Sequence, residues 1–141
     1  MIREGMLSEI MTREVTTVSP NTIMTDVDRI FNEKNIHHLP VVDSDRKVVG
    51  MLSRVDYDRI LHGMTLFKNR HVESYNQQLM RSLLVKEVMT KKVVCLHADA
   101  TIQAAADIFK ENLFHAIPLV NDEDRLVGIV TTYDLLAYAF H

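Results

Sequence analysis

Residues 48–56 read VVGMLSRVD, and residues 126–134 read LVGIVTTYD. Each stretch is an apolar run interrupted by one glycine, followed by a hydroxyl residue and, three positions later, an aspartate. An apolar run that ends in Ser-x-x-Asp or Thr-x-x-Asp predicts a strand leading directly into a helix. The two stretches are 78 positions apart, so the sequence predicts the same local structure twice.

The 78-residue offset extends well beyond these two stretches. Residues that recur at this offset without a gap are Met11 and Met89, Val15 and Val93, Phe31 and Phe109, His37 and His115, Pro40 and Pro118, and Asp56 and Asp134. Internal repetition identifies the structural unit, here a repeat at 7–61, a second at 85–139 and a connector at 62–84. Repeats this short are expected to be stable only when packed together.

Each repeat predicts the order β-α-β-β-α. Strands are expected at 15–18, 39–42 and 48–52 and, in the second copy, at 93–96, 117–120 and 126–130, with polar turns at 43–46 and 121–124. Helices are expected after Asn21 and Asp99, which are good N-cap residue types, and from Ser53 and Thr131 onward. The connector has apolar residues at helical spacing, among them Leu79 and Met80. The predicted fold class is α/β, with two pseudo-symmetric repeats of small sheets packed with helices.

Composition narrows the possible functions. The 141 residues are 47% hydrophobic and 25% charged with a net charge of −3, which is typical of a soluble globular chain and too short for a large multidomain enzyme. No excess of positive charge favours nucleic acid as a partner, and no apolar run is long enough for membrane insertion. The single cysteine, Cys95, sits among apolar residues, which predicts a buried thiol rather than an activated one. With no signal for export, a cytoplasmic location is expected.

Six segments together resemble a known family. They are Ile10-Met11-Thr12, 37–43 and 50–56 in the first repeat, and Val88-Met89-Thr90, 115–120 and 128–134 in the second. In this order and in two copies they resemble the tandem CBS-domain pair, also called a Bateman module, over nearly the whole chain. The resemblance implies a regulatory module that binds AMP, ADP or ATP, or in some members S-adenosylmethionine or cyclic dinucleotides, in clefts between the two repeats. It also implies a homodimer and no cofactor. Such modules are commonly attached to an enzyme, channel or transporter; the 141 residues contain no such attached domain, so the effector is expected to be a separate protein or absent.

The residue types suit a nucleotide. A strand that passes through glycine into a helix places free backbone N–H groups and the positive end of the helix dipole where they can bind a phosphate. Ser53 and Thr131 could contact that phosphate, Asp56 and Asp134 could accept both hydroxyls of a ribose, and Gly50 and Gly128 would allow close approach. The same tetrads are also capping boxes that need no ligand, so a purely structural role remains an alternative.

Histidines precede the Pro-containing strand of each repeat. His37, His38 and His115 could donate hydrogen bonds to a phosphate, or they could be ordinary strand-edge residues. Adjacent residues on a strand point to opposite faces, which disfavours a metal site at 37–38. The second repeat has Ala116 where the first has His38, so the two predicted sites need not bind the same ligand.

The resemblance nominates two sets of binding residues. One set combines Thr16, Ile36 and His37 with Ile129, Thr131 and Asp134, and the other combines Val94, Phe114 and His115 with Met51, Ser53 and Asp56. Thr12 and Thr90 are weaker candidates at the phosphate end. For Ile36, Met51, Phe114 and Ile129 the alternative is plain core packing.

Three classes of function follow from these observations. The first is an adenine-nucleotide sensor, in which occupancy changes the surface shown to a partner. The second is an enzyme, which the sequence disfavours because it contains no nucleophile with a base at a readable spacing and no Walker-type motif. The third is a structural dimerisation module without ligand.

Overall fold

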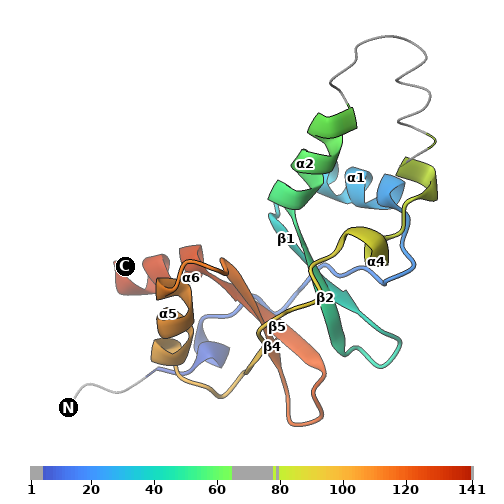
Figure 1. Cartoon of the computed structure of the whole chain (residues 1–141). Helices are drawn as coiled ribbons and strands as arrows, with labels where there is room; N and C mark the ends of the chain where they lie inside the picture. Colours follow the sequence, from blue (N-terminus) through green and yellow to red (C-terminus); the bar gives the residue numbers. More distant parts are fainter. Residues whose placement is uncertain (1–4, 65–77, 79, 141) are drawn as a thin grey trace. The chain divides into compact units, whose positions relative to one another are not determined.

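The computed structural model describes residues 5–64, 78 and 80–140 of the chain (Figure 1). Its elements, in chain order, are η1 (Leu7–Glu9), α1 (Met24–Glu33), β1 (His38–Val42), β2 (Val48–Ser53), α2 (Arg54–Met64), α4 (Val85–Val88), β3 (Leu96–His97), α5 (Ile102–Lys110), β4 (Ala116–Val120), β5 (Leu126–Thr131) and α6 (Thr132–Ala139). The predicted α/β class with two equivalent repeats is confirmed. Most of the predicted helical connector lies outside the described residues, Leu79 included.

The chain forms two compact units that do not coincide with the two repeats. Unit 1 consists of Met1–Val15, Asp45–Val48 and Val93–His141, and unit 2 consists of Thr16–Ser44 and Val49–Lys92. Each unit therefore combines most of one repeat with the beginning of the other.

Unit 2 is built on β1 and β2, which form a two-stranded sheet. The buried side of α1 presents Met24, Val27 and Phe31, whose spacing places them on one face of the helix. Phe31 packs on Tyr57 of α2 with their ring centroids 5.2 Å apart, and the Tyr57 hydroxyl donates a hydrogen bond to the Asp28 carboxylate of α1. These contacts join α1 to α2.

Unit 1 is built on three strands in the order β3-β4-β5. β3 is parallel to β4, and β4 is antiparallel to β5, with Ala116 opposite Thr131. Figure 1 shows α5 and α6 side by side beside this sheet. The first hairpin contributes residues 45–48 to this unit, because the Leu126 N–H donates to the Arg46 carbonyl at 2.9 Å.

Two local predictions were wrong. Asn21 and Asp99 do not cap helices: the N-cap residues are Ile23 and Thr101. At α5 the Thr101 hydroxyl oxygen forms the cap by accepting the Ala104 N–H at 3.1 Å. At α1 no side chain caps the helix. The first helical N–H groups, those of Met24 and Ile102, donate to the distant carbonyls of Leu83 and Gly5, both at 2.9 Å.

The first strand of each repeat is also shorter than predicted. Residues 15–18 contribute only a parallel bridge between Val18 and Val41, and the expected strand at 93–96 is found at Leu96–His97. Beyond these positions the backbone pairs with other segments: the carbonyls of Pro20 and Ala98 accept hydrogen bonds from Lys86 and Ser8 at 2.9 Å.

The beginnings of the two repeats, residues 5–12 and 83–90, are exchanged between the units; we call them the leading segments. Leu7, in the first leading segment, is fully buried in the unit 1 core with Ile117, Leu119 and Val130. Val85, its equivalent in the second, is fully buried in the unit 2 core with residues such as Phe31. Each core is therefore completed by the opposite repeat.

Gly50 and Gly128 permit this exchange. A Cβ atom on Gly50 would lie 2.9 Å from Cγ of Met89 and 3.1 Å from the Thr90 carbonyl oxygen, both in the second leading segment. At Gly128, Met11 and Thr12 occupy the corresponding positions. The sequence predicted that these glycines admit a ligand, whereas in the structure the space beside each is filled by a methionine and a backbone carbonyl.

We expect Leu7→Ala to lower the free energy of unfolding by about 2–5 kcal/mol, because it leaves a cavity in the core of unit 1. Val85→Ala should destabilise for the same reason in unit 2. Urea unfolding followed by circular dichroism measures both. Val55→Ala is the control, because Val55 is 60% exposed and its change should stay within about 0.5 kcal/mol. If the leading segments contributed nothing to stability, all three variants would have the same free energy of unfolding.

Candidate functional site

The two predicted Ser/Thr-x-x-Asp tetrads occupy equivalent places in the structure. Ser53 is the last residue of β2 and Thr131 the last residue of β5. Asp56 and Asp134 lie in the first turns of α2 and α6. All four residues are half-buried. In each unit, strand and helix thus bring a hydroxyl and a carboxylate to one helix N-terminus.

At α6 these groups form a complete capping box. The Thr131 hydroxyl oxygen accepts the Asp134 N–H at 3.3 Å. Oδ2 of Asp134 accepts the Thr131 N–H at 2.8 Å and the Thr131 hydroxyl at 3.1 Å. The structural role considered for this tetrad is therefore present without a ligand.

At α2 the same tetrad is less closed. The Ser53 hydroxyl oxygen accepts the Asp56 N–H at 3.1 Å, as the cap requires. The Asp56 carboxylate forms an ion pair with Arg59, with Oδ1 and Nη1 separated by 3.8 Å. The Arg59 side chain is 78% exposed, so this pair adds little to stability.

The histidine before each Pro-containing strand adjoins the helix start through its backbone. The His37 carbonyl accepts the Arg54 N–H at 2.8 Å, and the His115 carbonyl accepts the Thr132 N–H at 3.2 Å. Both histidines are exposed, whereas His38, the first residue of β1, is half-buried and its equivalent Ala116 is buried. Within each unit the structure therefore brings together a histidine, a hydroxyl and an aspartate.

The weaker candidates, Thr12 and Thr90, lie in the leading segments beside the two helix starts. The Thr12 N–H donates to the Ile129 carbonyl at 2.9 Å, and the Ile129 N–H donates back at 3.0 Å. Thr90 and Met51 exchange the same two bonds, each at 2.9 Å. Thr12 and Thr90 are exposed and lie beside the strands that end at Thr131 and Ser53.

The remaining nominated residues divide between the units. Thr16 and Ile36 are half-buried in unit 2, where Ile36 packs against the core, and Val94 and Phe114 are half-buried in unit 1. Ile129 is 8% exposed in unit 1. Each of the two sets of binding residues nominated from the sequence contains residues of both units. That the members of a set act together stays a prediction.

Sequence reasoning missed two cations beside the nominated residues. The Arg54 guanidinium lies 5.6 Å from the Phe31 ring centroid and donates to the Ile36 carbonyl at 3.4 Å. The Lys34 ammonium donates to the Thr16 hydroxyl at 3.2 Å. The second repeat has Thr132 in place of Arg54 and Asn112 in place of Lys34. This difference between the two repeats is the feature of the sequence that could have pointed to the two cations.

The Cys95 thiol is half-buried. Burial raises its pKa, and the nearby Asp124 carboxylate raises the pKa further. A raised pKa means less thiolate at neutral pH, as expected for a structural cysteine.

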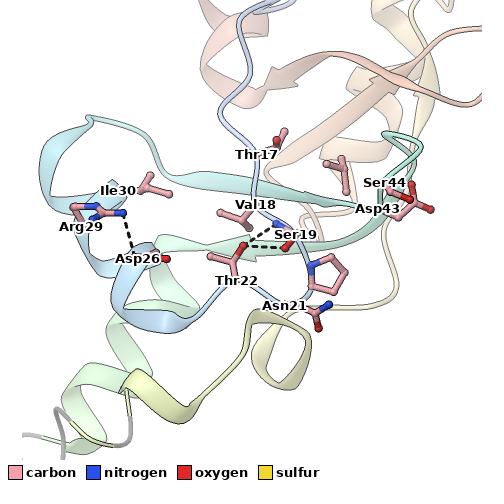
Figure 2. A pocket seen from close by; sticks show the side chains of 12 residues that line it. Thr17, Val18, Ser19, Asn21, Thr22, Asp26, Arg29, Ile30, Asp43 and Ser44 are labelled. Carbon is pink, nitrogen blue, oxygen red and sulfur yellow. Dashed lines mark hydrogen bonds and ion pairs between the residues drawn. The ribbon is translucent and has the colours of Figure 1, made fainter.

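A pocket of about 730 Å³ lies elsewhere in unit 2 (Figure 2). It is lined by the chain from Thr17 to Thr22, one side of α1, and residues 42–44, and includes none of the nominated residues. Two pairs of its polar groups are bonded to each other: the Ser19 N–H donates to the Thr22 hydroxyl at 3.0 Å, and Arg29 pairs with Asp26 at 3.1 Å.

The equivalent place in unit 1 differs. There Nε2 of His97 lies 2.6 Å from Oδ1 of Asp122, and these residues take the positions of Ser19 and Ser44.

Among the described residues, no helix has the length and hydropathy needed to cross a bilayer. In the same part of the chain, no group of three or more His, Cys, Asp or Glu residues is placed to hold a metal ion.

Comparison with known sequences gives a family match in both repeats. A family model described as the CBS domain matches residues 7–63 and 85–141. Inosine-5'-monophosphate dehydrogenase of Methanocaldococcus jannaschii is 31% identical over 91% of this chain, and homoserine O-acetyltransferase of Methanohalobium evestigatum is 28% identical over 92%. The chain spans only 22% and 23% of these two proteins. An uncharacterized protein of M. jannaschii is 29% identical, with 93% of this chain and 89% of that protein covered.

Solved structures share the fold. The CBS domain pair of protein MJ0100, in complex with 5'-methylthioadenosine and S-adenosyl-L-methionine, is 25% identical with a TM-score of 0.77, and 97% of each chain is covered. The CBS domain of a membrane protein from Sphaerobacter thermophilus is 29% identical with a TM-score of 0.80, covering 96% of this chain and 88% of that one.

We expect Thr131→Ala to cost about 1 kcal/mol of unfolding free energy, because it removes the side-chain cap of α6. Thr132→Ala is the matched control, since Thr132 is the adjacent first residue of the helix and has no capping role in the structure. Thermal unfolding without ligand measures both variants. Equal midpoints for the two would contradict the capping role of Thr131.

Proposed function

Because the chain belongs to the CBS-domain family, with one copy in each repeat, we propose that it is a regulatory module that binds adenosine-containing ligands and signals to a partner protein. The observation that carries the proposal is the recurrence in both units of a helix start with a hydroxyl, an aspartate and an adjoining histidine. The adenosine ligands of the MJ0100 domain pair support the same class of ligand.

The chemistry of each helix start suits part of a nucleotide. The carboxylates of Asp56 and Asp134 can accept hydrogen bonds from the two hydroxyls of a ribose. The helix N-terminus with its hydroxyl side chain favours a phosphate, and a histidine beside it can donate a further hydrogen bond. The proposed contacts therefore use Ser53, Thr131 and the histidines at the phosphate, and the two aspartates at the sugar.

A phosphate would change the cap of α6. In the structure the Thr131 hydroxyl donates to Asp134. A phosphate oxygen accepting that hydrogen bond would release the carboxylate for the ribose. Occupancy would in this way alter the first turn of α6, which is the kind of differential contact that links ligand binding to a regulatory output.

Charge favours a phosphate-bearing ligand. Lys34 and Arg54 add two cations beside Thr16 and Ile36, and His37 and His38 lie in the same unit. We therefore propose AMP, ADP or ATP, with S-adenosylmethionine, 5'-methylthioadenosine and cyclic dinucleotides as alternatives.

Two other readings give different experimental results. A structural module that has lost its ligand would bind none of these compounds. We propose no catalytic role, since the groups gathered at each helix start are those that bind phosphate and ribose rather than a nucleophile with its base.

Thermal unfolding with each ligand at fixed pH and salt tests the proposal. A ligand present at 100 times its dissociation constant stabilises the fold by about 2.7 kcal/mol, so the midpoint should rise with ligand concentration. AMP, ADP and ATP should raise it, and inorganic phosphate or guanosine monophosphate should raise it less. No shift with any adenosine compound would favour the structural module.

We expect Asp56→Asn and Asp134→Asn each to weaken AMP binding at least tenfold at the site to which that residue belongs. Asparagine keeps a capping oxygen but loses the charged acceptor for the ribose diol. Titration calorimetry with AMP and 2'-deoxy-AMP measures this. Wild-type protein should prefer AMP, whereas the double variant should not discriminate.

Asp58→Asn is the control, because Asp58 is an exposed residue of α2 outside the tetrad. Variants at 56 and 134 that bind both ligands like wild type would show that these aspartates do not hold the ribose.

We also propose that the module self-associates into a homodimer. Large apolar side chains remain exposed on the described helices, which is typical of protein interfaces. Light scattering coupled to gel filtration should give a mass that rises toward that of two chains with concentration. A monomer at every concentration would refute the proposal.

A further inference from the structure

The first turn of α2 is tied to α1 by a hydrogen bond between two side chains. The hydroxyl of Tyr57, a residue buried in the unit 2 core, donates to the carboxylate of Asp28 in α1. The Tyr57 ring also packs on Phe31 of the same helix. A buried hydroxyl needs a partner, so this bond fixes the position of α2 against α1. Tyr57 directly follows Asp56, the proposed ribose acceptor.

Arg54, the first residue of α2, anchors the same turn at a second point. Its N–H donates to the His37 carbonyl at 2.8 Å. Its guanidinium lies 5.6 Å from the Phe31 ring centroid and donates to the Ile36 carbonyl at 3.4 Å. Neither this anchor nor the hydrogen bond between the two helices uses the Asp56 carboxylate.

The second repeat lacks the side chains that make these contacts. Three residues differ at the 78-residue offset: Leu135 replaces Tyr57, Ala106 replaces Asp28, and Thr132 replaces Arg54. Leu135 packs against the unit 1 core but has no polar atom to bond. The first turn of α6 is held by its own capping box, in which Oδ2 of Asp134 accepts the N–H and the hydroxyl of Thr131.

The two aspartates therefore differ in what a ligand has to displace. The Asp134 carboxylate would have to leave the capping box before it could bind a ribose. The Asp56 carboxylate is held, among the described residues, by Arg59 alone, whose side chain is 78% exposed. An ion pair this exposed is weak, so a ribose could replace it at little cost.

We propose that Tyr57 and Asp28 are positioning residues that prearrange the Asp56 site, so that this site binds its ligand before the Asp134 site does. The inference rests on the proposed function and adds the order in which the two sites fill. A site already in its binding arrangement loses no affinity to rearrangement. Loss of one helix cap corresponds to about a fivefold change in an equilibrium constant, so the two dissociation constants should differ by about fivefold or more.

This order assigns the regulatory change to the second binding event. Filling the Asp56 site leaves the first turn of α2 unchanged, because its anchors do not involve that carboxylate. Filling the Asp134 site opens the cap of α6. The surface of the module would therefore change only at ligand concentrations above those that fill the first site.

Single-site variants measure the two affinities separately. Asp134→Asn leaves the Asp56 site intact, and Asp56→Asn leaves the Asp134 site intact. Titration calorimetry with AMP should give a dissociation constant about fivefold or more lower for Asp134→Asn than for Asp56→Asn. Equal constants, or tighter binding by Asp56→Asn, would overturn the inference.

Tyr57→Phe in both backgrounds tests the positioning role. The substitution removes the hydroxyl and keeps the ring, and Asp28 is half-buried and can bond water, so the unfolding temperature should fall by only a few degrees. The AMP dissociation constant should rise about fivefold in the Asp134→Asn background, as for one lost hydrogen bond, and stay unchanged in the Asp56→Asn background. A general loss of stability would act alike in both, so equal effects, or no effect in either, would refute the role.

Asp28 provides an independent check from α1. Asp28→Asn keeps an oxygen that can accept the Tyr57 hydroxyl and should retain the original affinity, whereas Asp28→Ala should match Tyr57→Phe. Combining Asp28→Ala with Tyr57→Phe should add nothing, because both remove the same bond. Additive effects would show that the two residues do not act through their hydrogen bond. Tyr133→Phe is the control, since it removes an exposed tyrosine hydroxyl from α6 and should change neither constant.

Failure of the proposed function would look different. A wild-type chain that binds no adenosine compound would refute the proposed function and the order of filling together. A chain that binds AMP equally well at both sites would refute the order of filling and leave the proposed function standing.

Discussion

Leu7 and Val85 occupy equivalent positions at the beginnings of the two repeats, and each is fully buried in a core formed mainly by the opposite repeat. Burial of such a side chain contributes about 1.5–3 kcal/mol, and its removal would also leave a cavity. Carbonyls of the same segments, those of Leu83 and Gly5, also accept hydrogen bonds from the first N–H groups of α1 and α5. Core packing and helix position in each unit thus depend on one reciprocal exchange.

The exchange also shapes the candidate sites. Thr12 pairs with Ile129, and Thr90 pairs with Met51, through two backbone hydrogen bonds each. These bonds hold the strands that end at Thr131 and Ser53, where the helix starts present their hydroxyls and aspartates. Gly128 and Gly50 allow the pairing because the leading segment passes where a side chain would otherwise lie. The glycines therefore act directly on packing. They affect the candidate sites only because this packing holds the strands that lead to them.

Periodicity and turn residues predict much of the fold because they report local constraints. The strands around Pro40 and Pro118 and the helix starts after Ser53 and Thr131 lie within one residue of their predicted bounds. The predicted cap at Asp99 was wrong because Thr101, two residues further on, caps α5: its hydroxyl oxygen accepts the Ala104 N–H at 3.1 Å. At α1 the N-cap residue Ile23 has no side-chain cap, and the Met24 N–H donates to the carbonyl of Leu83, a partner that local sequence preference cannot indicate.

The candidate site shows the same limit. The tetrads were predictable because their spacing alone forms a helix cap. Arg54 and Lys34 were not, because their relation to Phe31 and Thr16 exists only after α1 has packed on the sheet. The grouping of nominated residues across the two units likewise needs information that spacing does not contain.

The exchanged segments also couple the two repeats as they accumulate mutations. A change at Met11 alters the packing around Gly128 in the other repeat, and a change at Met89 alters the packing around Gly50. Neither copy can drift independently at these positions, because each carries part of the core of its counterpart. A substitution in either leading segment therefore has to fit the core of the other repeat, whereas outside the exchange the copies differ in charge, as at Arg54 and Thr132 or Asp58 and Leu136.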